Sequence, residues 1–144
     1  MKAARKKGYW EAIGYPVSTW IIYIILFSLA AAVGLYNFAA YFMTGTGLVL
    51  ISILFGLWAG TRTSSILNGS IGMGMLSGFM LGFVAGLVEL LLILGAGALL
   101  SGFAVAVSGS TSILALLSIG IESWIIAVMV STLSSAVGSE FARR

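Results

Sequence analysis

Two carboxylates stand alone in long apolar stretches of the sequence. Glu89 is the only charged residue in "GFVAGLVELLLILGAG" (82–97), and Glu122 is the only one in "LSIGIESWIIAVMV" (117–130). Neither stretch contains a lysine, arginine or histidine that could pair with its acid. A carboxyl group in such surroundings can bind a proton or a cation, or donate a hydrogen bond when it is protonated. The chemistry available to the chain therefore depends on where these two residues lie.

The composition identifies the environment of both acids. Of the 144 residues, 60% are hydrophobic and 8% are charged, whereas about a quarter of the residues in a soluble domain carry a charge. A charged side chain at the centre of a bilayer costs roughly 2.5–3.5 kcal/mol on insertion scales, so membrane-spanning segments avoid charge. We therefore expect a multi-pass protein with one domain, integral to the cytoplasmic or plasma membrane.

Four apolar stretches predict four transmembrane helices, since a helix needs about 20 residues to cross the hydrocarbon core. None of them alternates polar and apolar residues as a membrane β-strand does. The predicted architecture is an all-α transmembrane domain over residues 17–135, in which four helices form two antiparallel hairpins. A basic and aromatic interfacial segment (1–16) precedes this domain, and a short cytoplasmic tail (136–144) follows it. The predicted spans cover about residues 17–41, 45–60, 71–100 and 111–135.

The basic residues predict the orientation of these spans. They precede the first span, separate the second from the third, and follow the fourth, so both termini are expected on the cytoplasmic side. The two loops on the opposite side carry no charge. A cleaved signal peptide is the alternative interpretation of the N-terminal "RKK", apolar run and "LAAA". The residues expected to set the topology and contact lipid headgroups are Lys2, Arg5, Lys6, Lys7, Arg62, Arg143 and Arg144.

Several classes of function require residues that this chain lacks. It has no cysteine and no histidine, and so lacks the commonest metal ligands and the commonest general base. It also lacks a phosphate-binding loop and a nucleophile motif, and its basic surface is too small for nucleic acid. We expect no enzymatic activity, no metal site, no cofactor and no nucleic-acid partner.

The third predicted span carries a glycine at every fourth residue. In water, glycine weakens a helix by about 1 kcal/mol relative to alanine, but in lipid a row of small residues lets two helix backbones approach closely. The row predicts a packing face, which could also be a surface along which helices slide. Its members are Gly74, Gly78, Gly82 and Gly86.

Helical geometry relates the two acids to this row. At about 100° per residue, Glu89 lies close to Gly78 and Gly82 on the helical wheel, so it should face protein. Glu122 shares a face of the fourth predicted span with Ser118, and we expect this face to point inward as well. Without a basic partner, two neighbouring carboxyl groups cannot both be comfortably ionised. The predicted site for a proton or monovalent cation therefore consists of Glu89, Glu122 and Ser118.

These features favour two classes of function. The first is a small proton- or cation-coupled transporter or channel, which at four helices would work as a homo-oligomer. The second is a non-catalytic structural or accessory subunit, docked in a larger membrane complex through its glycine-rich helix face. In that case a protonated glutamate would form an interhelical hydrogen bond worth roughly 0.6–2 kcal/mol.

Overall fold

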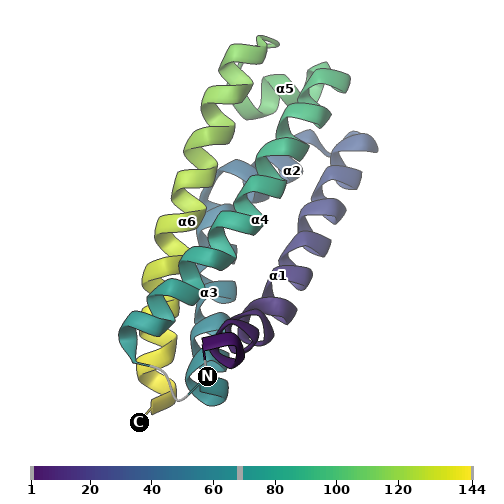
Figure 1. Cartoon of the computed structure of the whole chain (residues 1–144). Helices are drawn as coiled ribbons and strands as arrows, with labels where there is room; N and C mark the ends of the chain where they lie inside the picture. Colours follow the sequence, from purple (N-terminus) through teal and green to yellow (C-terminus); the bar gives the residue numbers. More distant parts are fainter. Residues whose placement is uncertain (1, 68–69, 144) are drawn as a thin grey trace.

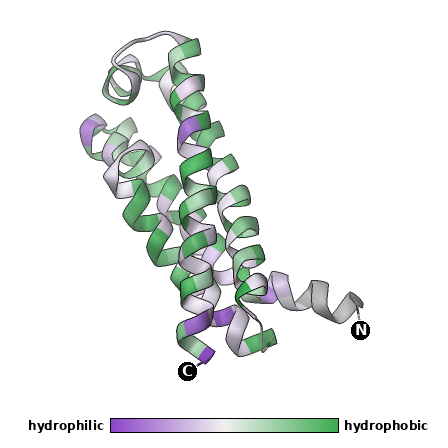
Figure 2. Ribbon diagram, turned by 90° about the vertical axis from the view of Figure 1, so that its left-hand side faces the viewer, coloured by the Kyte–Doolittle hydropathy of each residue, from purple (hydrophilic) through white to green (hydrophobic). Residues whose placement is uncertain are grey.

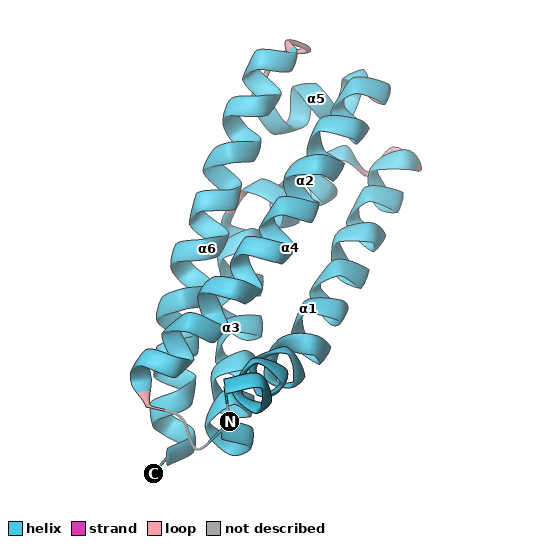
Figure 3. Cartoon of the chain, in the orientation of Figure 1, coloured by secondary structure: helices cyan, strands magenta, loops and turns pink. Residues whose placement is uncertain are grey.

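The part of the chain that the structure describes is built of helices and contains no strand. The computed structural model describes the backbone of residues 2–67 and 70–143, and it describes side chains from Gly8 onward. The all-α fold class is therefore confirmed (Figures 1 and 3). The helices are α1 (Lys2–Ala32), α2 (Tyr36–Thr44), α3 (Thr46–Leu67), α4 (Ile71–Leu99), α5 (Ser101–Ser108) and α6 (Ile113–Arg143).

Four helices are long and apolar enough to cross a membrane, which indicates a membrane protein. The candidate spans are Gly8–Ala32, Thr46–Leu67, Ile71–Leu99 and Ile113–Arg143. Figure 2 shows apolar residues along most of their length, with hydrophilic residues gathered toward the end of the bundle where the chain begins and ends. The first turns of α1 and the last turns of α6 lie at this same end (Figure 1).

The first span ends earlier than predicted, because α1 stops at Ala32. Gly34 has φ +95°, a left-handed conformation that glycine adopts with little strain. The Leu35 N–H donates to the Ala30 carbonyl at 2.9 Å, and the Gly34 N–H donates to the Ala31 carbonyl at 3.0 Å. This pair of bonds is a Schellman C-cap, which satisfies helix-end carbonyls and turns the chain. The prediction of one helix over residues 17–41 is therefore wrong at its C-terminal end.

Helix boundaries also differ from the prediction elsewhere. The second span continues through Leu67 rather than ending near residue 60, so Arg62 lies within α3. Residues 136–143, predicted as a tail, continue α6 without a break. The predicted loop after the third span contains α5, in which Phe103 and Ala104 are fully buried. α5 packs against α2 at the end of the bundle opposite the termini (Figure 1).

The long helices pack around α6, which lies against both α4 and α3. On the α4 side, a Cβ atom added at Gly78 would overlap the Ser131 carbonyl oxygen, and one at Gly82 would overlap the Ser131 hydroxyl. On the α3 side, a Cβ at Gly60 would overlap the Ser135 carbonyl oxygen. On both sides of α6 the helix backbones therefore approach so closely that only glycine fits between them.

Alanine substitutions test this close approach. Replacing Gly78 with Ala should lower the unfolding midpoint in detergent, because the Ser131 carbonyl would have to move and overpacking costs about 1–3 kcal/mol. Gly95 is the matched control on the same helix, since a Cβ there would meet nothing within 4 Å. Gly95→Ala should leave the midpoint unchanged or raise it, because alanine favours the helix. Equal losses at both positions would contradict the packing described here.

Candidate functional site

Glu89 lies in the interior of the bundle, on the face of α4 that contains the glycine row. Its side chain is 2% exposed, and Ala85 and Ile93, one turn away on either side, are fully buried. The carboxyl oxygen Oε2 is buried and has no hydrogen-bond partner among the described residues. In native proteins the large majority of buried polar groups are hydrogen-bonded, so an unpaired oxygen at this position requires an explanation.

No described basic side chain forms an ion pair with Glu89. The salt bridge that the structure shows joins Arg143 to Glu140 at 3.4 Å, near the end of α6. Burying an ionised carboxylate without a partner is costly, and the group avoids this cost by binding a proton or a cation. Among the described residues, no cluster of three or more acidic, histidine or cysteine side chains could hold a metal ion. A candidate site at Glu89 would therefore contain a single carboxyl group.

Glu122 and Ser118 lie elsewhere, on the exposed face of α6. The inward face of that helix includes Gly120, Ser123 and Ala127, and Glu122 is about 200° from Gly120 on the helical wheel. The prediction that both acids point into the interior is wrong for Glu122. It failed because α6 carries small residues on two faces, of which the row at every fourth position from Ser123 is the one that packs. Within one chain the structure does not bring Glu89 and Glu122 together.

Hydroxyl groups bind α6 to its two neighbours. Ser131 Oγ donates to the Gly78 carbonyl of α4 at 2.8 Å, and Ser134 Oγ lies 3.3 Å from the Ser52 carbonyl of α3. The sequence of α6 indicates this interface by a small residue at every fourth position, a pattern that the sequence analysis did not use. That row is Ser123, Ala127, Ser131, Ser135 and Ser139.

A second polar contact joins α3 to α4 in the same half of the bundle. Thr63 Oγ1 and Ser77 Oγ are hydrogen-bonded at 2.6 Å, and both residues are fully buried. Ser135 Oγ is buried as well and has no hydrogen-bond partner among the described residues. The interface of α3, α4 and α6 is thus lined by hydroxyl groups on the side of the bundle that carries the termini.

The interface continues from these hydroxyls toward Glu89. A Cβ at Gly86 of α4 would contact the Trp124 ring, and one at Gly120 of α6 would overlap the Leu90 side chain. These two contacts bracket the level of Glu89, at which α6 presents Ser123. Ser123 is 3% exposed. The buried acid therefore lies in line with a row of small and hydroxyl-bearing residues.

Arg62 is fixed to α1 by its guanidinium group. Nε donates to the Ala12 carbonyl at 3.0 Å, and Nη2 donates to the Glu11 carbonyl at 3.0 Å. Pro16 lies inside α1 and has no N–H, so the Ala12 carbonyl lacks its usual helical donor. Arg62 supplies that donor and holds α3 against the first turns of the candidate span.

The other predicted headgroup residues are described only in part. The side chains of Lys2, Arg5, Lys6 and Lys7 lie outside the described residues, as does Arg144. The Arg143 side chain is half exposed and paired with Glu140.

Comparison with known proteins assigns no family. No family model, curated protein or solved structure matches the chain.

Proposed function

We propose that this protein is a small membrane transport protein coupled to a proton or a monovalent cation, that it works as an oligomer, and that Glu89 is its ion-binding group. The observation that carries the proposal is the buried carboxyl of Glu89, 2% exposed, with one oxygen unpaired. An ionisable residue inside a membrane bundle is expensive to maintain and is most readily explained by an ion or proton pathway.

The packing around α6 supports this proposal. Alternating access requires α4 to move relative to α6 so that Glu89 communicates with one side of the membrane at a time. Where two helices touch through glycines and serines, such as Gly78 and Ser131, few side-chain rotamers have to change during a shift. A serine hydroxyl can also exchange one backbone carbonyl acceptor for another.

The exposed face of α6 supports the oligomer. A carboxyl group facing lipid is unfavourable, and Glu122 has Ser118 one turn away on the same face. In an oligomer, this face of one copy would be covered by a second copy, and each carboxyl would gain a hydroxyl partner.

The same exposed face favours a second candidate, an accessory subunit of a larger membrane complex. Docking through the glycine row of α4 is not available to such a subunit, because α6 of the same chain occupies that row. An unlike chain would instead dock on the face of Glu122 and Ser118. The two candidates therefore differ in the identity of the neighbouring chain.

The proposed topology has two antiparallel hairpins with both termini on the cytoplasmic side. It is supported by the segregation of the basic residues to the end of the bundle where the chain begins and ends. The chain lacks cysteine, so Ser70→Cys and Ser112→Cys, both at exposed positions, can be probed singly with a membrane-impermeant thiol reagent on intact cells. Position 112 should be labelled and position 70 protected. Labelling at position 70 alone would reverse the orientation.

Flux measurements test the role of Glu89. In proteoliposomes with an internal pH-sensitive dye and an imposed potassium diffusion potential, the wild-type protein should accelerate proton entry. Glu89→Gln should reduce this flux about tenfold or more, because glutamine keeps the shape but removes the titrating group. Glu122→Gln protein that assembles into the oligomer should show the same flux as the wild type. Circular dichroism and gel-filtration profiles of the variants provide the control for folding.

A parallel experiment with sodium and potassium gradients distinguishes a cation from a proton. Equal flux in Glu89→Gln and wild-type vesicles would contradict the assignment of Glu89. A wild-type protein that moves no ion and purifies with an unlike membrane chain would favour the accessory subunit.

A further inference from the structure

Two neighbouring pockets of different chemistry lie along the face between α1 and α3, and together they are called the groove. One part has a volume of about 520 Å³ and is lined by polar and aromatic side chains, including Glu11, Tyr15 and Arg62. The other has a volume of about 540 Å³ and is lined mainly by aromatic and aliphatic side chains, including Tyr23, Leu54 and Trp58. These residues belong to neither the Glu89 site nor the exposed face of α6.

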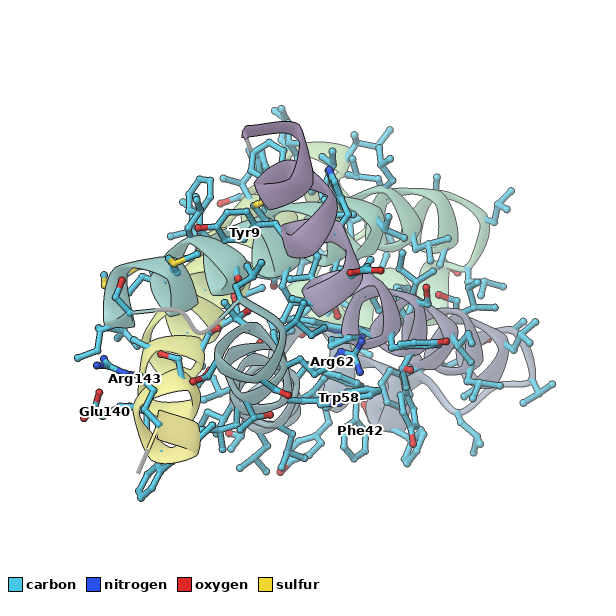
Figure 4. The ribbon with its side chains drawn as sticks, turned by 60° about the horizontal axis from the view of Figure 1, so that its bottom comes forward. Tyr9, Phe42, Trp58, Arg62, Glu140 and Arg143 are labelled. Carbon is cyan, nitrogen blue, oxygen red and sulfur yellow. The ribbon has the colours of Figure 1, made fainter. Side chains whose placement is uncertain are left out.

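The residues that line the two parts follow one another along both helices. On α1, the lining residues Glu11, Tyr15, Thr19, Tyr23 and Phe27 recur at every fourth position, so each lies one turn from the next along a ridge that is inclined to the helix axis. On α3, Trp58 of the apolar part is one turn from Arg62 of the polar part. Figure 4 shows Arg62, Trp58 and Phe42 on the same side of the bundle, with Arg62 between α1 and α3.

The charge of Arg62 is held at the polar end of the groove without being neutralised. Its hydrogen-bond acceptors are the backbone carbonyls of Ala12 and Glu11, and its Cζ lies 5.0 Å from the centre of the Tyr15 ring. No described carboxylate forms an ion pair with it. Nη1 makes no hydrogen bond to a described residue, so its N–H groups remain for a ligand, together with the second N–H of Nη2. A fixed guanidinium of this kind suits a phosphate oxygen.

Glu11 lines the same end of the groove, and its side chain is exposed. The polar end therefore presents one positive and one negative group. A ligand that carries both a phosphate and a primary ammonium matches this pair, whereas a purely anionic headgroup would meet Glu11 unfavourably.

The length of the groove matches an acyl chain. Ile51, at the far end of the apolar part, is eleven residues from Arg62 in α3, a rise of about 16 Å. This is close to half of the roughly 30 Å hydrocarbon thickness of a bilayer, which is the depth of one leaflet.

We infer that the groove between α1 and α3 binds one molecule of a zwitterionic aminophospholipid. Its phosphate lies on Arg62, its ammonium group on Glu11, and one acyl chain along the aromatic part past Trp58. The inference does not depend on ion transport, because the residues named for the headgroup and the chain belong to α1 and α3, whereas Glu89 belongs to α4 and faces α6.

Native mass spectrometry of the purified protein tests the inference. Phosphatidylethanolamine, phosphatidylglycerol and phosphatidylcholine with identical acyl chains are added in equal amounts, and the bound lipid is measured. The wild-type protein should retain one phosphatidylethanolamine in preference to the others. Arg62→Gln should lower its retention about tenfold or more, because it removes the charged hydrogen-bond donor for the phosphate. Arg143→Gln is the control, because Arg143 lies at the same end of the bundle but outside the groove.

Two further variants separate the headgroup from the chain. Glu11→Gln should remove the preference for phosphatidylethanolamine over phosphatidylglycerol. Leu54→Trp should fill the apolar part and lower the retention of all three lipids, whereas Leu50→Trp, exposed on the same helix outside the groove lining, should not.

Arg62 also donates to the Ala12 carbonyl, which has no helical donor because of Pro16, so Arg62→Gln could fail to fold. In that event the comparison of Leu54→Trp with Leu50→Trp decides the outcome. Equal retention of lipid by these two variants, or a wild-type preference for phosphatidylglycerol, would overturn the inference.

Discussion

Helix α6 can lie against α3 and α4 at once only because glycines face it from both sides. Gly60 on α3 and Gly78 on α4 leave room for the α6 backbone itself, so Ser131 reaches the Gly78 carbonyl directly at 2.8 Å. In a bilayer there is no hydrophobic driving force between helices, and close packing and interhelical hydrogen bonds have to supply the association. A side chain on either glycine would push α6 away from the helix that carries it, and one on Gly78 would weaken that hydrogen bond.

The position of α6 determines where the two membrane acids lie. Because the row from Ser123 to Ser139 turns inward, the opposite face of α6 turns outward and carries Glu122 with it. Because the glycine row of α4 turns toward α6, Glu89 turns inward with it. The two carboxyl groups thus have different surroundings, and different roles are proposed for them: ion binding for Glu89 and subunit contact for Glu122.

Hydropathy predicted the four long helices because each must shield its backbone from lipid with about 20 apolar residues. It did not predict the turn at Gly34, since the sequence on both sides of that turn is equally apolar and only the backbone conformation changes. Hydropathy does not predict α5 for a related reason, because its eight residues are too few to cross a membrane. The inward position of Glu89 was predictable, because on the helical wheel of α4 it lies beside the glycine row. The position of Glu122 was predicted wrongly, because small residues occur on two faces of α6 and only one of them packs.

Infrared spectroscopy of the reconstituted protein at neutral pH, in a buffer free of sodium and potassium, tests most directly whether Glu89, the proposed ion-binding group, holds a proton inside the bundle when no monovalent cation competes for it. The wild-type protein should show the carbonyl band of a protonated carboxyl group, shifted on exchange into deuterium oxide. The band should disappear in Glu89→Gln and persist in Glu122→Gln. A band that is unchanged in Glu89→Gln would contradict proton binding by Glu89.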